Sequence, residues 1–85
     1  MSMQINDVLR CEVDVKRSDC NREPAHCHIV RKRDRVAQVW LNPVLLEKGH
    51  SLDHKEQNIV LDFVANHVSE LEREYEYNRE HGAYD

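Results

Sequence analysis

Apolar and polar residues alternate with a period of two in the first half of the chain. Over about residues 8–16, every second side chain is apolar: Leu9, Cys11, Val13 and Val15. This alternation predicts a half-buried strand. Two more strands are predicted over about residues 26–32 and 36–41, because a short polar turn separates two runs suited to a hairpin. Residues 44–47 fit either a short fourth strand or a segment packed over the sheet.

A helical period dominates the second half. Between residues 53 and 80, apolar residues recur at spacings of three and four: Ile59, Val60, Phe63, Val64, Val68, Leu71 and Tyr75. Asp53 and Glu56 have the spacing of a capping box, and Ser51 is an alternative cap. One helix over about residues 53–80 would measure about 42 Å, whereas a domain of this size has a diameter of about 30 Å. We therefore expect the last turns to extend beyond the sheet.

These patterns predict a single small α+β domain over residues 1–85. Its architecture would be a three- or four-stranded antiparallel β-meander packed against one long C-terminal helix. Of the 85 residues, 40% are hydrophobic and 33% are charged, a balance that favours a modest core under a charged surface. The length excludes large nucleotide-binding folds and barrels.

The charge is distributed unevenly along the chain. Residues 1–42 carry eight Lys or Arg against six Asp or Glu, whereas residues 43–85 carry four against ten. The net charge of −4 therefore combines a basic half with an acidic half. This argues against nucleic-acid binding over the whole surface but leaves room for a local basic patch.

The cysteines and the hydropathy bear on location. The chain has an odd number of cysteines: Cys11, Cys20 and Cys27. No apolar run approaches the roughly 18 residues that a membrane span requires. The first residues lack the features of a signal peptide. We therefore expect reduced thiols, a cytoplasmic protein and no membrane partner. Cys27 is flanked by two histidines, but neighbours on a strand face opposite ways, so no Cys–His dyad and no catalytic residue is predicted.

His26 and His28 are candidates for metal binding. Two residues apart on a strand, their imidazoles point to the same face, where zinc would accept them as ligands. Further ligands would have to come from Cys20, Asp19, His50 or His54. No recognised zinc-ligand spacing is present, so the favoured interpretation is structural hydrogen bonding, without a cofactor.

The predicted hairpin tip is strongly basic. Four of its five residues carry positive charge: Arg31, Lys32, Arg33 and Arg35. A protruding ribbon of this kind would suit phosphate contacts. Trp40 is the nearest aromatic residue and there is no stacking array, so a soluble turn that protects an edge strand is the alternative.

The end of the predicted helix is acidic and aromatic. It carries Glu70, Glu72, Glu74, Glu76 and Glu80, together with Tyr75, Tyr77 and Tyr84. Contacts from Arg73 to Glu70 and from Arg79 to Glu76 would offset part of the repulsion. An ordinary solvated helix face is one interpretation. The other is a surface that a partner or a second copy completes, with the candidate residues Trp40, Glu70, Glu74, Tyr75 and Tyr77.

Three features of the chain occur together in one known family. They are the run Glu23-Pro24-Ala25-His26-Cys27-His28-Ile29, the run Val39-Trp40-Leu41-Asn42-Pro43-Val44, and a Gly49-containing turn before a long helix. In this combination about residues 8–78 resemble Domain of Unknown Function 4160, a family of small bacterial proteins with a Pro-Pro-His-x-His strand. Ala25 departs from the second proline, and the turn at residues 31–35 is more basic than the family pattern. The resemblance implies a small sheet with one helix, no established activity, and members resembling parts of toxin–antitoxin-like gene pairs.

Three functional hypotheses follow. The first is a small cytosolic interaction module, one half of a toxin–antitoxin-like pair, which contacts a protein partner or a second copy through the C-terminal helix. The second is a nucleic-acid-binding or nuclease-like protein that uses the basic hairpin and the His26/His28 face. The third is a metal-binding protein.

Overall fold

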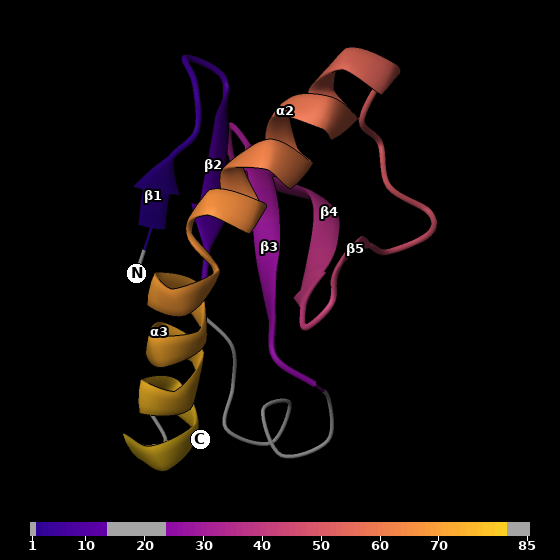
Figure 1. Cartoon of the computed structure of the whole chain (residues 1–85). Coiled ribbons are helices and arrows are strands. Elements are labelled where there is room, and N and C mark those ends of the chain that lie inside the picture. The colour runs from indigo at the N-terminus through magenta and orange to yellow at the C-terminus, as the bar shows by residue number, and fades with distance from the viewer. Residues whose placement is uncertain (1, 14–23, 82–85) are drawn as a thin grey trace.

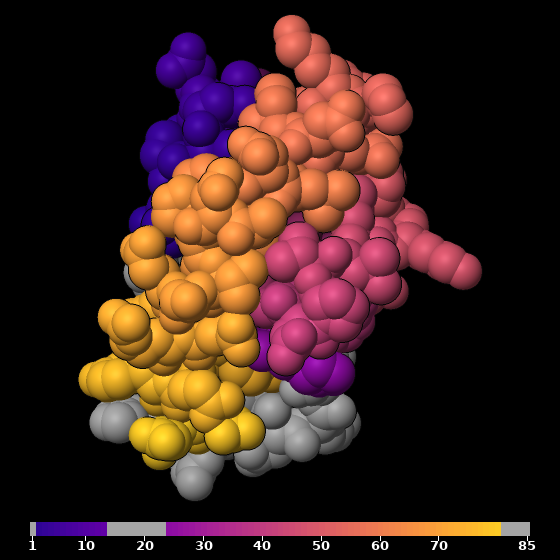
Figure 2. All heavy atoms as spheres, viewed as in Figure 1, coloured from indigo at the N-terminus to yellow at the C-terminus, as the bar shows by residue number. Residues whose placement is uncertain are grey.

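The computed structural model describes residues 2–13 and 24–81, and its architecture is α+β. Five antiparallel strands pair in chain order, so the predicted meander is confirmed (Figure 1). The strands are β1 (Ser2–Gln4), β2 (Leu9–Glu12), β3 (His26–Arg31), β4 (Asp34–Leu41) and β5 (Val44–Leu46). Two helices, α2 (His54–Asn66) and α3 (Val68–His81), cover one face of the sheet. Figure 2 shows them as one diagonal band across that face.

The described part of the sheet has more strands than the three or four predicted. The additional strand β1 is only three residues long, too short to show an alternation of apolar and polar residues. It is defined by its pairing with β2. The strand predicted over residues 8–16 is observed as β2, over residues 9–12; Val8 precedes it, and residues 14–16 lie outside the described residues. Residues 44–46 do form a strand, which settles the alternative left open for residues 44–47.

The hairpin of β3 and β4 is the centre of the sheet. Its register pairs His26 with Trp40 and His28 with Gln38. The turn consists of two residues, of which Lys32 has a positive φ of 58°. The turn is shorter than the polar run suggests, so β4 begins at residue 34 rather than at residue 36.

The chain after β5 continues along β4. The backbone N–H of Glu47 donates to the carbonyl of Gln38 at 2.8 Å, and that of Ser51 donates to the carbonyl of Val36 at 2.9 Å. Gly49, between them, has a φ of 80°, a left-handed conformation that favours glycine. Residues 47–51 therefore run alongside β4.

The core lies between the sheet and the helices. Alternate residues of the strands point into it, as the period of two predicts. The buried set comprises Leu9, Cys11, Val13, Cys27, Ile29, Val39 and Leu41 from the sheet region, and Leu52, Val60, Val64, Leu71 and Tyr75 from the helical half.

The prediction of one long helix is wrong, because the helix breaks at His67. This residue has a φ of −127° and a ψ of 16° and ends α2. Next to the break, the side-chain amide of Asn66 donates to the carbonyl of Asp62 at 2.9 Å, and the His67 ring stacks on Phe63 at 4.1 Å. Side-chain bonds to the backbone compete with helix continuation.

The break also removes the single straight helix on which the expected overhang rested, but the last turns of α3 still lie beyond the lower ends of the strands (Figure 1). The longest dimension of the chain is 35 Å, shorter than the straight helix would be. After the bend, α3 runs along the lower end of β3 and buries Leu71 and Tyr75. The start of the helical region was predicted correctly: Asp53 is the N-cap, and both hydrogen bonds of its capping box with Glu56 are present.

Within the described residues, neither helix combines the length and the apolar character that crossing a bilayer demands.

Candidate functional site

A cluster of aromatic rings surrounds His26 at the start of β3. The His26 ring lies 5.1 Å from the ring of His28, 5.5 Å from Trp40 and 5.4 Å from Tyr75, each in an edge-to-face arrangement. Nδ1 of His26 lies 2.9 Å from the carbonyl oxygen of Pro24. Since a carbonyl can only accept, Nδ1 carries the proton. The cluster joins β3, β4 and α3, which gives His26 a structural role.

The cluster unites residues that the sequence assigned to separate sites. Tyr75 was expected on an interaction surface, but only 2% of it is exposed, so that assignment is wrong. Trp40 is half-buried and lies on the sheet rather than beside the acidic helix residues. The apolar period that includes Tyr75 is the signal that correctly places it inside.

The zinc hypothesis lacks further ligands among the described residues. Within residues 2–13 and 24–81, no group of three or more His, Cys, Asp or Glu comes together as a metal site. Cys20 and Asp19, two of the suggested ligands, lie outside the described residues. His54 is the first residue of α2, whereas His50 lies near His28. Metal binding at His26 and His28 stays a prediction.

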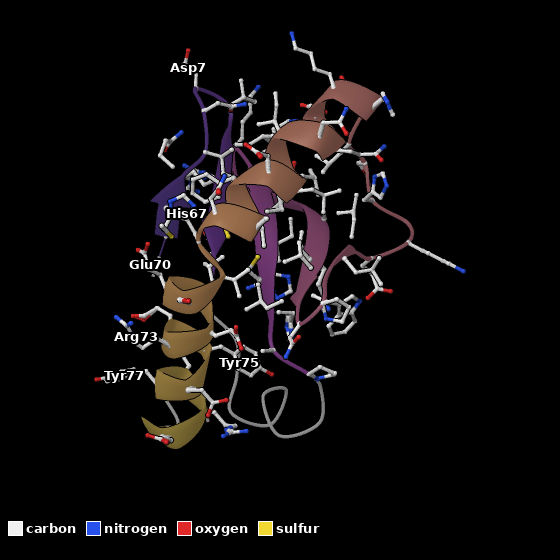
Figure 3. The ribbon with its side chains drawn as sticks, in the orientation of Figure 1. Asp7, His67, Glu70, Arg73, Tyr75 and Tyr77 are labelled. Carbon is white, nitrogen blue, oxygen red and sulfur yellow. The ribbon has the colours of Figure 1, made fainter. Side chains whose placement is uncertain are left out.

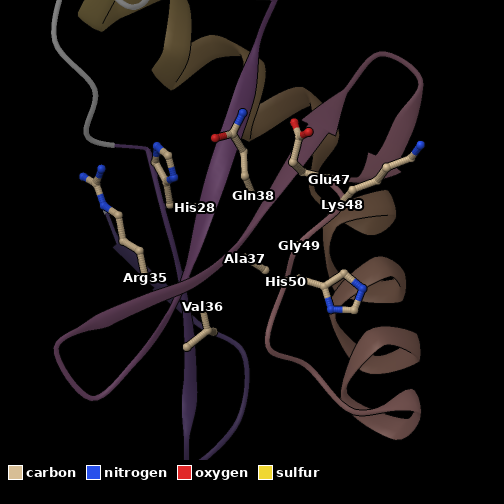
Figure 4. Close-up of a pocket in the computed structure, with 9 residues that line it drawn as sticks. All are labelled: His28, Arg35, Val36, Ala37, Gln38, Glu47, Lys48, Gly49 and His50. Atoms are coloured by element: carbon tan, nitrogen blue, oxygen red, sulfur yellow. The ribbon is translucent and has the colours of Figure 1, made fainter.

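A hollow of about 230 Å³ opens on the sheet beside His28. We call it the open-face hollow, because His28 and Gln38 alternate with core residues and so face away from the helices. Figure 4 shows side chains from β3, β4 and the segment after β5 around it. Its polar and charged lining consists of His28, Arg35, Gln38, Glu47, Lys48 and His50.

Only some of the residues that line this hollow stand out in the sequence. His28 and Arg35 were candidates for different ligands, and His50 was named only as an additional metal ligand. Gln38, Glu47 and Lys48 were missed. Gly49, in its left-handed conformation, is the available signal, since it marks where the chain turns back along β4.

The basic residues of the hairpin do not act together. Nη2 of Arg31 lies 2.6 and 2.7 Å from the two carboxylate oxygens of Glu56, so Arg31 ties β3 to the start of α2. Arg35 lines the open-face hollow, while Lys32 and Arg33 form the exposed tip. The predicted basic patch is therefore divided between an ion pair, the hollow and the tip, and does not form one surface.

A second hollow, of about 280 Å³, lies on α3. It is lined by residues at the helical spacing i, i+3, i+4 and i+7, which we call the outer stripe of α3: Glu70, Arg73, Glu74 and Tyr77. Figure 3 shows Glu70, Arg73 and Tyr77 on the side of α3 turned from the sheet, and Tyr75 on the side that faces it. Tyr77 is 56% exposed.

The two described cysteines do not form a nucleophilic site. Cys11 and Cys27 are free and buried in the core. A hydrogen bond with Cys11, together with burial, raises the pKa of the Cys27 thiol far above its ordinary value. A nucleophilic cysteine needs an accessible thiolate, so Cys27 serves as a core residue.

One comparison with known proteins gives a result. The family described as "Domain of unknown function (DUF4160)" matches residues 17–76. No curated protein and no solved structure matches the chain. The matched stretch contains β3 to β5, α2 and most of α3, and thus the open-face hollow and most of the outer stripe of α3, whereas β1 and β2 precede it. Since this stretch is more than half of the chain, the protein belongs to the DUF4160 family.

Proposed function

We propose that the chain is a cytoplasmic interaction module that binds a partner protein through the outer stripe of α3, and that the partner presents a basic segment there. One observation carries the proposal: the same helix has an inner face fixed to the sheet and a separate, hollowed face exposed to solvent.

The contacts that attach α3 to the sheet come from residues outside the outer stripe. Leu71 and Tyr75 are buried against the sheet, and the side-chain amide of Asn78 donates to the carbonyl of Val13 at 3.0 Å. These contacts hold α3 in place from the opposite part of its surface. The outer stripe points away from these contacts, on the side of α3 turned from the sheet.

The chemistry of the outer stripe suits a basic partner. Tyr and Arg are the residue types that most often dominate binding energy at interfaces, and Tyr77 and Arg73 supply both. Glu70 and Glu74 place two carboxylates beside them. Glu76, by contrast, pairs with Arg79. Lys or Arg on a partner would complement the carboxylates and speed association.

The resemblance of family members to parts of toxin–antitoxin-like gene pairs supports a partner that is a different protein. In such a pair the partner is a second small protein made with this one. The proposal is therefore a complex of two different chains rather than a homo-oligomer.

Site-specific photo-cross-linking tests the proposal. A photoreactive phenylalanine analogue is placed at Tyr77 and, as a matched control, at the exposed Asn58 of α2, in cells that make the protein. We expect one adduct of defined mass from position 77 and none from position 58. An adduct of twice the chain mass, equal adducts at both positions, or no adduct would contradict the proposal.

A further inference from the structure

We propose that the sheet carries a second binding site, which takes single-stranded nucleic acid with a phosphate in the open-face hollow and a base against Trp40. This site is separate from the outer stripe of α3. The hollow lies on the sheet face opposite the helices, and Trp40 lies at the end of that face where the His26 ring contacts Tyr75 of α3.

The open-face hollow has the donors that a phosphate needs. Arg35 and Lys48 supply positive charge, and His28, Gln38 and His50 supply hydrogen-bonding groups of lower charge. Guanidinium groups bind phosphate oxygens in pairs, whereas a lysine acts as a point charge. Glu47 is the one carboxylate among the residues that line the hollow. The two cationic side chains of the lining, Arg35 and Lys48, outnumber this single carboxylate.

Positive charge continues from the hollow across the sheet. Arg35 pairs with Val30, and Val30 pairs with Arg10, so the three residues form one row on the same face. Two strand spacings separate the two arginines by about 10 Å. Arg10 also donates to the carbonyl of Lys32 at 3.3 Å and lies 3.6 Å from Glu12. A strand of nucleic acid crossing the sheet would therefore meet Arg10 as well as Arg35, with Glu12, which pairs with His28 in the register, as the carboxylate beside Arg10.

Trp40 is placed to stack on a base. It is two residues from Gln38 on β4, hence on the same face as the hollow. It is half-buried, and the His26 ring packs against it at an angle of 72°, which holds the indole in position. Leu45, its neighbour on β5, is 58% exposed and extends the apolar surface.

This combination favours a single strand over a duplex. Proteins that bind single strands pair a cationic track with aromatic rings on which unstacked bases lie. In a duplex the bases are already stacked and Trp40 would have no partner. The carboxylates of the outer stripe of α3 lie on the helix side of the sheet and point away from this face.

Fluorescence anisotropy with labelled 12-nucleotide RNA and DNA, as single strands and as duplexes, tests the site. The test variants are Arg35→Gln/Lys48→Gln and Trp40→Leu. The control, Lys55→Gln/Arg79→Gln, removes the same charges from exposed positions on the helices, where the ion pair of Arg79 with Glu76 is at the surface and contributes little to stability. Arg31 is left unchanged because it pairs with Glu56. Circular dichroism and urea midpoints establish that each variant is folded.

We expect the charge variant to weaken single-strand binding about tenfold or more at low salt and to reduce the salt slope by about one. Trp40→Leu should weaken binding about tenfold without changing that slope, since base stacking is apolar. Failure of every single strand to bind, equal loss in the control variant, tighter binding of duplex, or equally tight binding of free adenosine monophosphate would overturn the proposal.

Discussion

At the scale of single residues, side chains that are adjacent in sequence have unrelated roles. Arg31 forms an ion pair with Glu56, whereas Arg35, four residues later, lines the open-face hollow. Tyr75 is buried and Tyr77 is exposed. The sequence separates the two tyrosines, because Tyr75 belongs to the apolar period of the helix and Tyr77 does not. It does not separate the two arginines, because the twist and register of the hairpin decide which way each of them points.

The buried Cys27 thiol gives a prediction about alkaline pH. Its ordinary pKa is 9.0, and the hydrogen bond with Cys11 and burial raise the folded-state pKa above that value. The contribution of the protonated Cys27 thiol to the free energy of unfolding is therefore complete below pH 9. It decreases as the pH rises above 9, because the thiol then ionises in the unfolded chain but not in the folded one. One such group contributes a slope of about 1.4 kcal/mol per pH unit.

Urea unfolding at pH 8 and at pH 10.5 measures this slope. Between these values the wild type should lose about 1–2 kcal/mol more than Cys27→Ala, which has no thiol to ionise at this position. Cys27→Ala will be less stable at both pH values because it leaves a small cavity, so the comparison rests on the change with pH. Parallel losses in the two proteins would contradict the assigned protonation.

At the scale of elements, the periods in the sequence indicate the buried residues correctly. They are a poorer guide to the residues at which helices and strands begin and end. The stripe from Val60 to Tyr75 does face the core. The break at His67 was not foreseen because neither Gly nor Pro marks it. On either side of the break, Val64 and Leu71 are both buried against the sheet. The short β1 strand was missed because pairing with β2 defines it.

Asn78 anchors α3 to the end of β2, and this predicts a specific loss of stability. Its side chain is 9% exposed and donates to the carbonyl of Val13, 65 residues away in sequence. Asn78→Ala should lower the free energy of unfolding by about 1–2 kcal/mol, because a buried hydrogen bond is lost.

The matched control for this variant is Glu80→Ala, on the exposed part of the same helix. It should change the free energy of unfolding by less than about 0.5 kcal/mol. Thermal or urea unfolding followed by circular dichroism provides both values. Equal effects of the two substitutions would mean that Asn78 does not anchor the helix.

At the scale of the whole molecule, the charge difference between the halves of the chain becomes a difference between surfaces. The acidic half contributes the outer stripe of α3, and the basic half contributes most of the cations of the sheet face. This polarity was visible in the sequence. The hollows were not, because the open-face hollow requires the turn at Gly49 to bring Lys48 and His50 beside Arg35.

The two-surface arrangement makes protein binding and nucleic-acid binding separable. The measurement that tests it most directly is the affinity of the partner cross-linked from position 77, purified and titrated by calorimetry against four proteins. These are the wild type, Glu70→Lys, Asp62→Lys and Arg35→Gln/Lys48→Gln. Glu70 and Asp62 are both exposed helical carboxylates, so the same charge reversal is made on and off the outer stripe of α3.

We predict that Glu70→Lys weakens binding about tenfold or more, because it places a cation against the basic segment of the partner. Asp62→Lys and the double variant should stay within about twofold of the wild type, the range of surface changes outside an interface. Equal losses for Glu70→Lys and Asp62→Lys, or a loss confined to the Arg35/Lys48 variant, would contradict binding through the outer stripe of α3.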